Sequence, residues 1–274
     1  MPGRTMVITG ASDGIGASAA RRLHANGEKV VVVGRSPEKT RAVAAELGVD
    51  SYVSDFSELA QVRTLARQLR STYPTIDVLV NNAGGVASRI DWTPDGYETT
   101  LQVNYLAPFL LSTMLMDVLC ASRGAVINTS SSAQNLLGRV NADDLLSTHR
   151  YRPSKAYALT KLAINLFTAE LHRRHNGAGV STASFHPGWV DSNFGVASGS
   201  RLLKLINRTP LHKTGASPDK GAEQLIWLAT SDPEIAWTSG HYYVRHRIGR
   251  ANRQAYDATL ARQLWDRTAE MLGG

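Results

Sequence analysis

Short, nearly continuous apolar runs alternate with longer amphipathic stretches along the chain. The apolar runs cover residues 6–8, 30–33, 78–81, 125–129 and 180–185. Such runs, rich in β-branched residues, are typical of parallel strands that are buried on both faces. Helical periodicity lies between them, in residues 17–24, 37–47, 58–73, 97–120, 153–175 and 217–230. The alternation predicts an α/β fold in which a doubly wound parallel sheet, with right-handed crossovers, is flanked by helices.

The length and composition of the chain suit a single domain over residues 1–274. The chain has 274 residues, 43% of them hydrophobic, which is enough to bury one large core. It has no evident linker, internal repeat or low-complexity tract. Its one cysteine, Cys120, lies within an apolar helical pattern, so an intrachain disulfide is impossible and we expect Cys120 to pack in the core. A reducing compartment suits such a chain.

The positive charge does not by itself indicate a nucleic-acid partner. The formal net charge is +7, but the lysines and arginines are scattered, and no basic run is interleaved with aromatic residues. A general surface excess of cations, which also attracts an anionic cofactor, explains this distribution better than nucleic-acid binding does. The longest apolar stretches are shorter than the ~20 residues that span a bilayer, and there is no recognisable signal peptide. We therefore expect a cytoplasmic protein with no membrane anchor.

The first apolar run leads directly into a glycine-rich turn. The turn is Thr9-Gly10-Ala11-Ser12-Asp13-Gly14-Ile15-Gly16, and a helical stretch follows at once. Glycines let the backbone approach a pyrophosphate, and the N–H groups at the start of the helix face its negative charge. The turn therefore predicts a nucleotide site. The alternative is a strand-to-helix turn with a purely structural role.

Further motifs follow the glycine turn in a characteristic order. They are Asn81-Asn82-Ala83-Gly84, Asn104, Ser130-Ser131-Ser132, Tyr157-Ala158-Leu159-Thr160-Lys161 and His186-Pro187-Gly188. From Met6 to about Asp232, the chain resembles the short-chain dehydrogenase/reductase family in these motifs and their spacing. The segment around Tyr157 and the tail motifs Ala251-Asn252-Arg253 and Leu264-Trp265-Asp266 are similar to its retinol-dehydrogenase-like branch.

The resemblance implies a Rossmann-type domain that transfers a hydride between a nicotinamide cofactor and a small carbonyl or alcohol substrate. The likeness to the retinol-dehydrogenase branch favours a largely apolar aldehyde or ketone. The family resemblance also implies a homo-oligomer, either a dimer or a tetramer. The sequence has no cluster of Cys and His ligands, and this chemistry needs no metal. The alternative function is a catalytically silent dinucleotide-sensing or regulatory protein that has kept the fold.

The residue that follows the second apolar run decides which nicotinamide cofactor we expect. In dinucleotide-binding folds this position lies over the adenosine ribose, where an acidic residue binds the 2′-hydroxyl and a basic one accommodates a 2′-phosphate. The chain has Arg35 there, and a guanidinium group matches phosphate bidentately. We therefore expect NADP(H) rather than NAD(H), with Lys39 as a helper. The alternative is that Arg35 is a solvated loop cation.

The resemblance implies the remaining cofactor contacts. Asp55 resembles the adenine-contacting aspartate of the family, although aspartate is also favoured as the N-cap of a following helix. The Pro187-Gly188 turn, with Val190 and Ser192, resembles the segment beside the nicotinamide carboxamide. The complete set implied for cofactor binding is Gly10, Ser12, Asp13, Gly14, Ile15, Gly16, Arg35, Asp55, Asn82, Ala83, Gly84, Tyr157, Lys161, Pro187, Gly188, Val190 and Ser192.

Two tyrosine–lysine pairs have the four-residue spacing that the chemistry requires, Tyr151 with Lys155 and Tyr157 with Lys161. Pro153 suits the first turn of a helix, so Tyr151 precedes the helix, whereas Tyr157 and Lys161 share one face within it. We therefore assign Tyr157 and Lys161. We expect the Lys161 charge, together with an oxidised nicotinamide ring, to favour the Tyr157 phenolate, so that this residue serves as general acid in reduction and base in oxidation. By resemblance, Lys161 would also hold the nicotinamide ribose.

Two further residues complete the catalytic group that the resemblance implies. Ser131 matches the hydroxyl donor that binds the substrate oxygen, and Ser132 is the second choice if the alignment slips by one residue. Asn104 matches the helix asparagine that holds a water in the proton relay. The alternative for Asn104 is a hydrogen bond inside the helix without a catalytic role. We expect His186 to pack or cap rather than to act as a base.

Two segments near the carboxyl end extend the expected domain. The irregular stretch 193–217 contains an amphipathic piece, 201–206, and is expected to form a substrate lid over the carboxyl ends of the strands. In it, Arg201, Lys204 and Arg208 would face solvent or an anionic group of the substrate; a solvated surface helix is the alternative. A C-terminal helix is expected over residues 255–272, where it could cover the usual association surface.

Overall fold

The computed structural model describes residues 3–87, 89–136, 140–142, 152–188 and 217–273. These residues contain one eight-stranded sheet with the order β3-β2-β1-β4-β5-β6-β7-β8. The strands are β1 (Thr5–Thr9), β2 (Lys29–Gly34), β3 (Ser51–Val53), β4 (Val78–Asn81), β5 (Ala125–Thr129), β6 (Ser181–Phe185), β7 (His241–Val244) and β8 (Arg247–Ile248). Strands β1 to β7 pair in parallel, and β8 runs antiparallel to β7. The predicted doubly wound α/β fold is confirmed.

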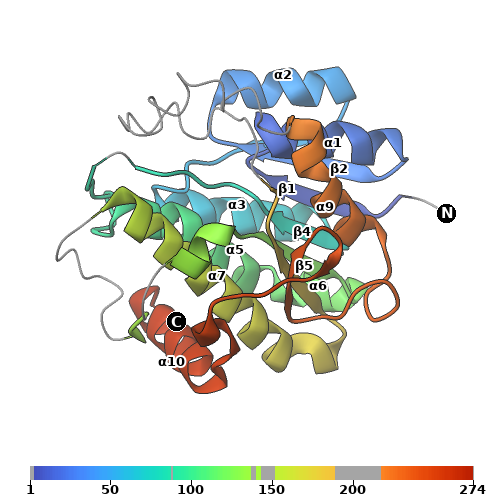
Figure 1. Ribbon diagram of the computed structural model, residues 1–274. Helices are drawn as coiled ribbons and strands as arrows, with labels where there is room; N and C mark the ends of the chain where they lie inside the picture. Colours follow the sequence, from blue (N-terminus) through green and yellow to red (C-terminus); the bar gives the residue numbers. More distant parts are fainter. Residues whose placement is uncertain (1–2, 88, 137–139, 143–151, 189–216, 274) are drawn as a thin grey trace.

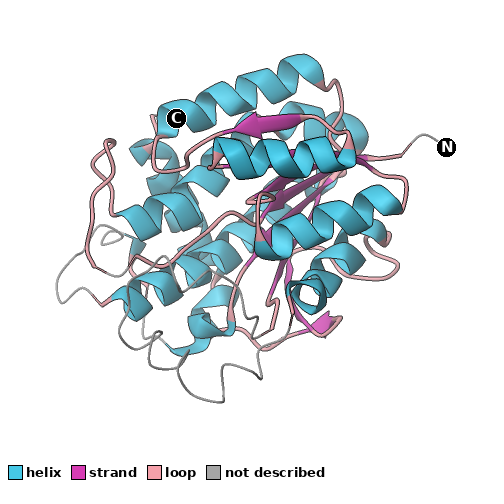
Figure 2. Ribbon diagram, turned by 90° about the horizontal axis from the view of Figure 1, so that it is seen from above, coloured by secondary structure: helices cyan, strands magenta, loops and turns pink. Residues whose placement is uncertain are grey.

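Helices cover both faces of the sheet, as Figures 1 and 2 show. The longer elements are α1 (Gly14–Ala25), α2 (Pro37–Leu47), α3 (Leu59–Thr72), α5 (Ala107–Met114), α6 (Met116–Ser122), α7 (Pro153–His175), α9 (Pro218–Thr230) and α10 (Ala258–Met271). The short turns are α4 (Thr99–Leu101), the π-helical η1 (Gln102–Leu106), and the 3₁₀ turns η2 (Ser132–Leu136), η4 (Asn176–Ala178) and η6 (Arg253–Tyr256). Helices α1, α2 and α9 cover one face, and α3, α5 and α7 cover the other.

Successive residues of each strand point to opposite faces, and this divides the core into two halves. In β1, Val7 packs into the half beneath α3, α5 and α7, whereas Met6 and Ile8 pack beneath α1 and α9. Because both faces are covered by helices, apolar residues are favoured on both sides of such a strand. This explains why the strands appear in the sequence as continuous apolar runs rather than as alternating ones.

The helical pattern predicted over residues 97–120 is confirmed, but the segment is not one continuous helix. The segment is divided into α4, η1, α5 and α6, and the chain bends by 61° between Thr99–Met114 and Met116–Ser122. Pro108 has no N–H to donate to the carbonyl of Asn104, so the regular ladder is interrupted there. The N–H of Ala107 donates instead to the carbonyl of Gln102, which gives the wider π-helical turn. The predictions over 37–47 and 153–175 match α2 and α7.

Strands β7 and β8 are absent from the sequence-based prediction. Arg245 and His246 join them, and both have positive φ angles, 51° and 60°. Two-residue hairpin turns of this kind usually contain Asn or Gly, which adopt positive φ readily. Neither residue type stands in this turn, so the hairpin leaves no turn signal in the sequence.

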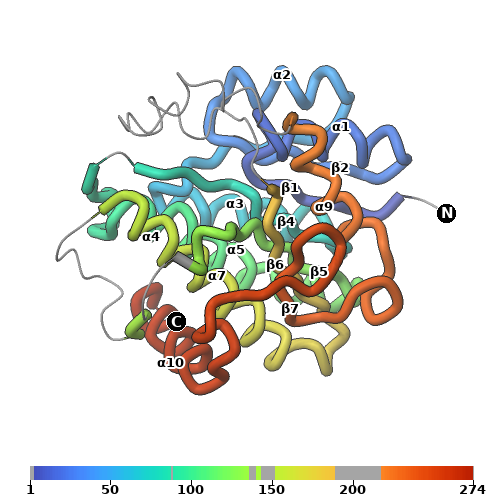
Figure 3. The backbone as a smooth tube through the Cα atoms, viewed as in Figure 1, coloured from blue at the N-terminus to red at the C-terminus, as the bar shows by residue number. Residues whose placement is uncertain are grey.

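The C-terminal segment crosses the molecule and ends in α10, beside α7. Figure 3 follows this chain from β7 to α10. The helix begins at Ala258 rather than at residue 255, because the side chain of Asp257 caps it by accepting hydrogen bonds from two backbone N–H groups of the first turn. Trp265 then packs between α5 and α7, with its ring centroid 4.8 Å from that of Phe109 and 5.7 Å from that of Phe167.

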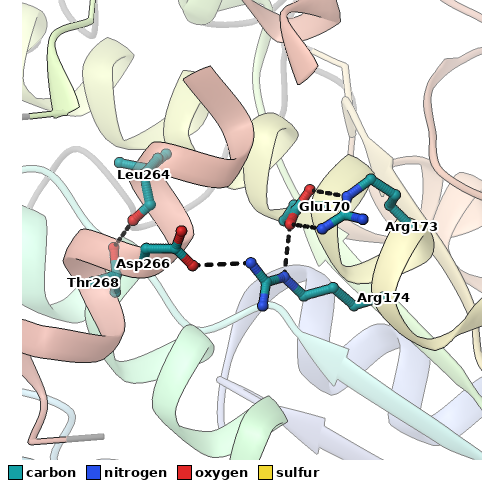
Figure 4. A network of polar contacts seen from close by, with 6 residues as sticks. All are labelled: Glu170, Arg173, Arg174, Leu264, Asp266 and Thr268. Atoms are coloured by element: carbon teal, nitrogen blue, oxygen red, sulfur yellow. Dashed lines mark hydrogen bonds and ion pairs between the residues drawn. The ribbon is translucent and has the colours of Figure 1, made fainter. Parts of the chain in front are cut away.

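A network of ion pairs joins α10 to α7 (Figure 4). The buried Glu170 carboxylate accepts hydrogen bonds from Arg173 and Arg174 at 2.6–2.8 Å. Arg174 also donates to Asp266 of α10 at 2.9 Å and lies 4.7 Å from the ring centroid of Trp265. Burial raises the pKa of the Glu170 carboxyl, but the two guanidinium groups outweigh this effect and hold that pKa below its usual value. The network and the Trp265 contact together fasten the C-terminal helix.

Three sequence-based expectations concern segments away from the sheet. Cys120 is half-buried and packs against the core, as predicted. The predicted lid lies outside the described residues except for Ser217, which caps α9. Within the described ranges, no single helix is long and apolar enough to cross a bilayer, although the bent pair Thr99–Met114 and Met116–Ser122 passes that test of length and composition together.

Replacing Trp265 with Ala should destabilise the protein by about 3–5 kcal/mol, because a large aromatic side chain is removed from a packed site. The loss is measured from urea unfolding curves. The matched control is Trp92→Ala, since the Trp92 side chain is 51% exposed, and it should cost less than about 1 kcal/mol. An equal loss in the free energy of unfolding for the two variants would show that the packing of α10 does not stabilise the domain.

Candidate active site

A cleft of about 690 Å³ lies at the carboxyl ends of the strands. Its walls come from the turns after β1, β2, β3, β4, β5 and β6 and from α7. The sheet order reverses between β1 and β4, and open α/β sheets bind ligands outside the carboxyl ends of the strands at such a point. The predicted residues that line the cleft are Gly10, Ser12, Asp13, Gly14, Ile15, Arg35, Asp55, Asn82, Ala83, Gly84, Ser131, Tyr157, Lys161, Pro187 and Gly188.

The glycine turn brings the backbone after β1 close to the loop after β4. Gly10 has φ of 66°, and a Cβ at that position would lie 2.9 Å from the Cα of Ala83. A Cβ at Gly16 would lie 2.3 Å from the carbonyl oxygen of Gly10. Gly16 therefore permits close packing of α1 on the turn and is not among the residues that line the cleft, and its expected cofactor contact stays a prediction. The start of α1 is left facing the cleft, as a pyrophosphate site requires.

Thr9 and Asn82 clamp the two loops together. The hydroxyl oxygen of Thr9 accepts hydrogen bonds from the N–H groups of Asn82 and Ala83, each at 3.0 Å. The amide of Asn82 donates to the carbonyl of Thr9 at 3.0 Å. The first asparagine of the motif, Asn81, donates to Asn128 at 2.9 Å and so links β4 to β5. The Asn-Asn-Ala-Gly motif thus steadies the sheet beside the cleft.

The end of the cleft beyond β2 carries the predicted cationic residues. Arg35 is exposed and lines the cleft directly after the strand. Lys39 also lines the cleft, but its ammonium group binds the carboxylate of Asp13 at 2.7 Å. The side chain of Asp13 also accepts from the N–H of Gly14 and caps α1. Arg35 is therefore better placed than Lys39 to meet an anionic group.

Asp55 lies in the cleft wall, but it is not the N-cap of the helix that follows. Its carboxylate accepts hydrogen bonds from the N–H and the hydroxyl of Ser57, at 2.9 and 2.8 Å. Helix α3 begins at Leu59, two residues after Ser57, and the N–H of Leu59 donates to the carboxylate of Asp95. The capping alternative for Asp55 is therefore wrong, because its side chain is used within the turn before α3. Its expected contact with adenine stays a prediction.

Tyr157 and Lys161 lie one turn apart on α7 and both face the cleft. The ammonium group of Lys161 donates to the carbonyl of Thr129 at 2.8 Å and lies 5.5 Å from the ring centroid of Tyr157. Helix α7 starts at Pro153, as predicted, because proline needs no hydrogen-bond acceptor at that position. The rival Tyr151 lies outside the described residues, and its partner Lys155 is exposed and does not line the cleft.

Burial dominates the ionisation of this pair. It raises the pKa of Tyr157 to about 12, although the hydrogen bond with Ser131 opposes the shift. Burial also lowers the pKa of Lys161 to about 7. In the protein by itself, the expected lowering of the phenol pKa by Lys161 is therefore not found, because removing either charged form from water costs more than their mutual attraction returns.

The three serines after β5 have different partners. The buried Ser130 donates its hydroxyl to the carbonyl of Lys161 at 3.1 Å. Ser131 lines the cleft, contacts Tyr157, and accepts a hydrogen bond from the N–H of Ala133 at 3.2 Å. Ser132 is exposed, and its N–H donates to Nδ1 of His186 at 3.4 Å. The geometry favours Ser131 over Ser132 as the substrate hydroxyl donor and gives His186 the packing role that we expect.

Asn104 acts through the loop after β4 rather than from the cleft wall. It lies in the π-helical turn η1, where its amide accepts from the N–H of Gly85 at 2.8 Å and donates to the carbonyl of Gly85 at 2.7 Å. A Cβ at Gly84 would lie 2.7 Å from the same amide oxygen. Asn104 is absent from the cleft lining, and its amide is engaged by the loop after β4. The structure shows a loop-positioning role, and the relay water stays a prediction.

Other residues of the cleft have weak or no signals in the sequence. Thr129 offers its carbonyl to Lys161, a contact that any residue type could make. Ser36 lines the cleft and caps α2, which the Ser36-Pro37 pair could have indicated. The predicted contacts Val190 and Ser192 lie outside the described residues. Among the described residues, no group of three or more His, Cys, Asp or Glu is arranged to hold a metal ion.

Comparison with known proteins agrees with this geometry. The family model described as short chain dehydrogenase matches residues 4–201. A protein of a Streptomyces strain, named as a candidate daunorubicin C-13 ketoreductase, is 40% identical, and the match covers 100% of this chain and 94% of that protein. Human retinol dehydrogenase 12 is 35% identical, with coverage of 100% and 87%. A solved structure of an uncharacterised protein from Mycobacterium paratuberculosis has a TM-score of 0.78 and 31% identity, with coverage of 98% and 93%.

The fold and the cleft define an NAD(P)-binding oxidoreductase of the Rossmann type. The chain belongs to the short-chain dehydrogenase/reductase family, as its motifs indicate. Its curated relatives include retinol dehydrogenases and the candidate ketoreductase, so the likeness to the retinol-dehydrogenase branch is also confirmed. Residues of the cleft fit a dinucleotide, since the glycine turn, the start of α1 and the close approach at Gly10 form a cradle that a larger side chain would fill.

The depressed pKa of Lys161 makes the stability of the cofactor-free protein depend on pH. The folded state releases this proton near pH 7, whereas the unfolded chain keeps it up to about 10.5, so unfolding takes up a proton between these values. Stability attributable to this site therefore rises with pH in that window, by up to about 1.4 kcal/mol per pH unit. Below this pH window, Lys161 is protonated in both the folded and the unfolded state, and the folded state bears the full cost of burying its charge.

Lys161→Met should abolish this dependence. The advantage of the variant over the wild type in the free energy of unfolding should be largest below about pH 7 and should shrink as the pH approaches about 10. Urea unfolding at a series of pH values measures it. Lys155→Met, at an exposed position of the same helix, is the matched control and should leave the pH dependence unchanged. A constant difference between Lys161→Met and the wild type would contradict the shifted pKa.

Proposed function

We propose that the protein is an NADP(H)-dependent carbonyl reductase that acts on a largely apolar ketone or aldehyde, with Tyr157 as the proton donor. The observation that carries this proposal is the convergence of Tyr157, Lys161 and Ser131 in one cleft with the glycine turn. Two of these residues come from α7 and one from the turn after β5, so the cluster exists only in the folded chain.

The ionisation of the cleft supports reduction as the favoured direction. A phenol with a pKa of about 12 is fully protonated at neutral pH and can donate its proton to a carbonyl oxygen that develops negative charge. The Ser131 hydroxyl, which contacts Tyr157, would donate a second hydrogen bond to the same oxygen. A bound reduced nicotinamide would supply the hydride. Lys161 would hold the ribose beside it, as the family resemblance implies.

The choice of NADP(H) rests on Arg35. It stands at the ribose position after β2, and no acidic residue occupies that position to bind a free 2′-hydroxyl or repel a phosphate. Lys39 is engaged by Asp13, which leaves Arg35 as the principal cation for a 2′-phosphate. A metagenomic member of the family that was solved with NADP supports the choice, with a TM-score of 0.66 and 26% identity.

The names of the relatives support an apolar carbonyl or alcohol as substrate. The Streptomyces relative is named for reduction of a ketone, and two human relatives are named for the oxidation of retinol and of a polyprenol. All of these names concern a C=O or CH–OH group on a largely apolar molecule. We therefore place an apolar ketone or aldehyde first among the substrates to be tested.

Tyr157→Phe should lower kcat for carbonyl reduction by about 10²- to 10⁴-fold, because it removes the general acid but keeps the ring. NADPH oxidation is followed with a panel of aliphatic and aromatic ketones and aldehydes, and NADPH binding is followed by fluorescence. Binding should persist in the variant. Tyr151→Phe is the matched control and should retain activity. A fully active Tyr157→Phe would exclude the assigned acid, and a wild type that binds NADPH but reduces no carbonyl would favour the dinucleotide-sensing alternative.

Arg35→Ala should raise the dissociation constant for NADPH by about 10- to 100-fold, since a charge-assisted hydrogen bond to phosphate is lost. Affinity for NADH should change little. Titration of the purified variants with both cofactors measures this. Arg41→Ala, which removes an exposed arginine of α2 that does not line the cleft, is the control and should bind both cofactors as the wild type does. Equal weakening of NADPH and NADH would refute the role of Arg35 in cofactor choice.

A further inference from the structure

A second cavity, of about 220 Å³, lies between α7, the strands β6 and β7, and the C-terminal segment. Asn165 and Ala169 line it from α7, and Ser184 and Tyr242 line it from the two strands. The remaining wall comes from Gly240, His241 and residues 251–261, which include η6 and the first turn of α10. None of the described residues that line this cavity also lines the cleft.

Buried polar groups without partners are concentrated around this cavity. Asn165, Ser184 and Tyr242 are 4%, 1% and 6% exposed. Both polar atoms of the Asn165 amide and the hydroxyl of Ser184 have no hydrogen-bond partner, whereas the Tyr242 hydroxyl interacts with the Gln134 side chain. All three of these atoms belong to residues that line this cavity. Nearly all buried polar groups in proteins are hydrogen-bonded, because an unmet one costs free energy, so this cluster points to a ligand.

Small apolar side chains form much of the rest of the wall. Five alanines line the cavity, namely Ala169, Ala251, Ala255, Ala258 and Ala261. Their methyl groups leave the space that larger side chains would fill. Tyr256 also lines the cavity and is 62% exposed, with its hydroxyl held by the N–H of Ala251 at 2.9 Å. A ligand would therefore have a polar group at one end and an apolar remainder.

The charges around the cavity favour an uncharged ligand. No lysine or arginine is among the described residues that line it, and the His241 imidazole is the one basic group there, so an anion would have no permanent counter-charge. Its one carboxylate, that of Asp257, is engaged by the N–H groups of Thr259 and Leu260 at the start of α10. The unpartnered groups at the base are neutral donors and acceptors.

We propose that this cavity binds a small uncharged molecule with a carboxamide or alcohol group. Asn165 and Ser184 would hold that group, and the alanine wall would accept a short apolar tail. A primary amide fits the observations best, because it can donate to Oδ1 and accept from Nδ2 of Asn165 at once. At about 30 Å³ for each water, the cavity has the volume of about seven water molecules, which a short-chain amide would occupy.

The position of Asn165 relates this cavity to the cleft. Asn165 follows Lys161 by four residues on α7, as Lys161 follows Tyr157, so the three side chains lie along one face of the helix. Ser184 lies two residues before His186, and His186 lines the cleft. The proposed ligand would thus contact the helix that carries the catalytic pair, one turn further along. The proposal does not depend on the proposed function.

The test is titration of the purified full chain with butanamide, followed by saturation-transfer NMR of the ligand. Saturable binding is expected, with a dissociation constant on the order of 1 mM. Asn165→Leu should weaken it by at least about tenfold, and Ser184→Ala should weaken it less, because one hydrogen bond is lost instead of two. Gln224→Met is the matched control: it replaces a buried amide, also with an unpartnered nitrogen, on α9 at the opposite face of the sheet. This variant should bind as the wild type does.

Two results would overturn the proposal. The first is the absence of saturable binding to the wild type, which would mean that water alone fills the cavity. The second is unchanged binding by Asn165→Leu, which would place the amide elsewhere. If Asn165→Leu does not fold, Ala258→Leu replaces it, since Ala258 lines the cavity from an exposed position at the start of α10. Its larger side chain should block the cavity, and retained binding by the folded variant would also refute the site.

Discussion

The attachment of α7 to β5 is the constraint on which the site depends. The side chains of Asn128 and Ser130, at the end of β5, donate to the Thr168 hydroxyl and the Lys161 carbonyl of the helix. In the opposite direction, Lys161 donates to the carbonyl of Thr129. These three bonds cross between the same two elements and so set both the rotation and the axial position of α7. Tyr157, one turn before Lys161, is thereby directed into the cleft beside Ser131. A helix held only by apolar packing would tolerate the small shifts that general acid catalysis does not.

Burial then determines which protons the site holds. The same packing that orients Tyr157 and Lys161 limits their contact with water, more for the buried Lys161 than for the half-buried Tyr157, and this raises the pKa of the phenol and lowers that of the amine. Both shifts favour the neutral forms. The protein by itself is therefore arranged as a proton donor next to an uncharged amine, and a charged cofactor in the cleft would alter both equilibria because the local dielectric is low. The pH dependence of stability and the direction of the proposed reaction follow from this one cause.

The C-terminal segment is part of the domain rather than an appendage. Gln134, in the turn after Ser131, accepts hydrogen bonds from the backbone N–H and the side-chain amide of Asn252. Further along, Trp265 and Asp266 fasten α10 to α7. The segment consequently supports the two elements that position Ser131 and Tyr157, since η2 follows Ser131 and α7 carries Tyr157. It also closes the second cavity, whose unpartnered amide and hydroxyl groups would otherwise face water.

The sequence alone determined most of the strands and helices and the fold class, and it predicted the nucleotide cleft, because these depend on local patterns. Continuous apolar runs mark strands buried on both faces, and the glycine turn and the Tyr157 and Lys161 pair are contiguous motifs whose spacing is set by strand and helix geometry. Only the tertiary structure decided the packing role of Gly16, the loop contact of Asn104, the break in the helix before β5 and the hairpin turn at Arg245 and His246. It also decided the pKa shifts and the second cavity. The physical reason is that each of these depends on which atoms from distant parts of the chain surround a residue, and burial and hydrogen-bond partners are properties of that environment rather than of the residue itself.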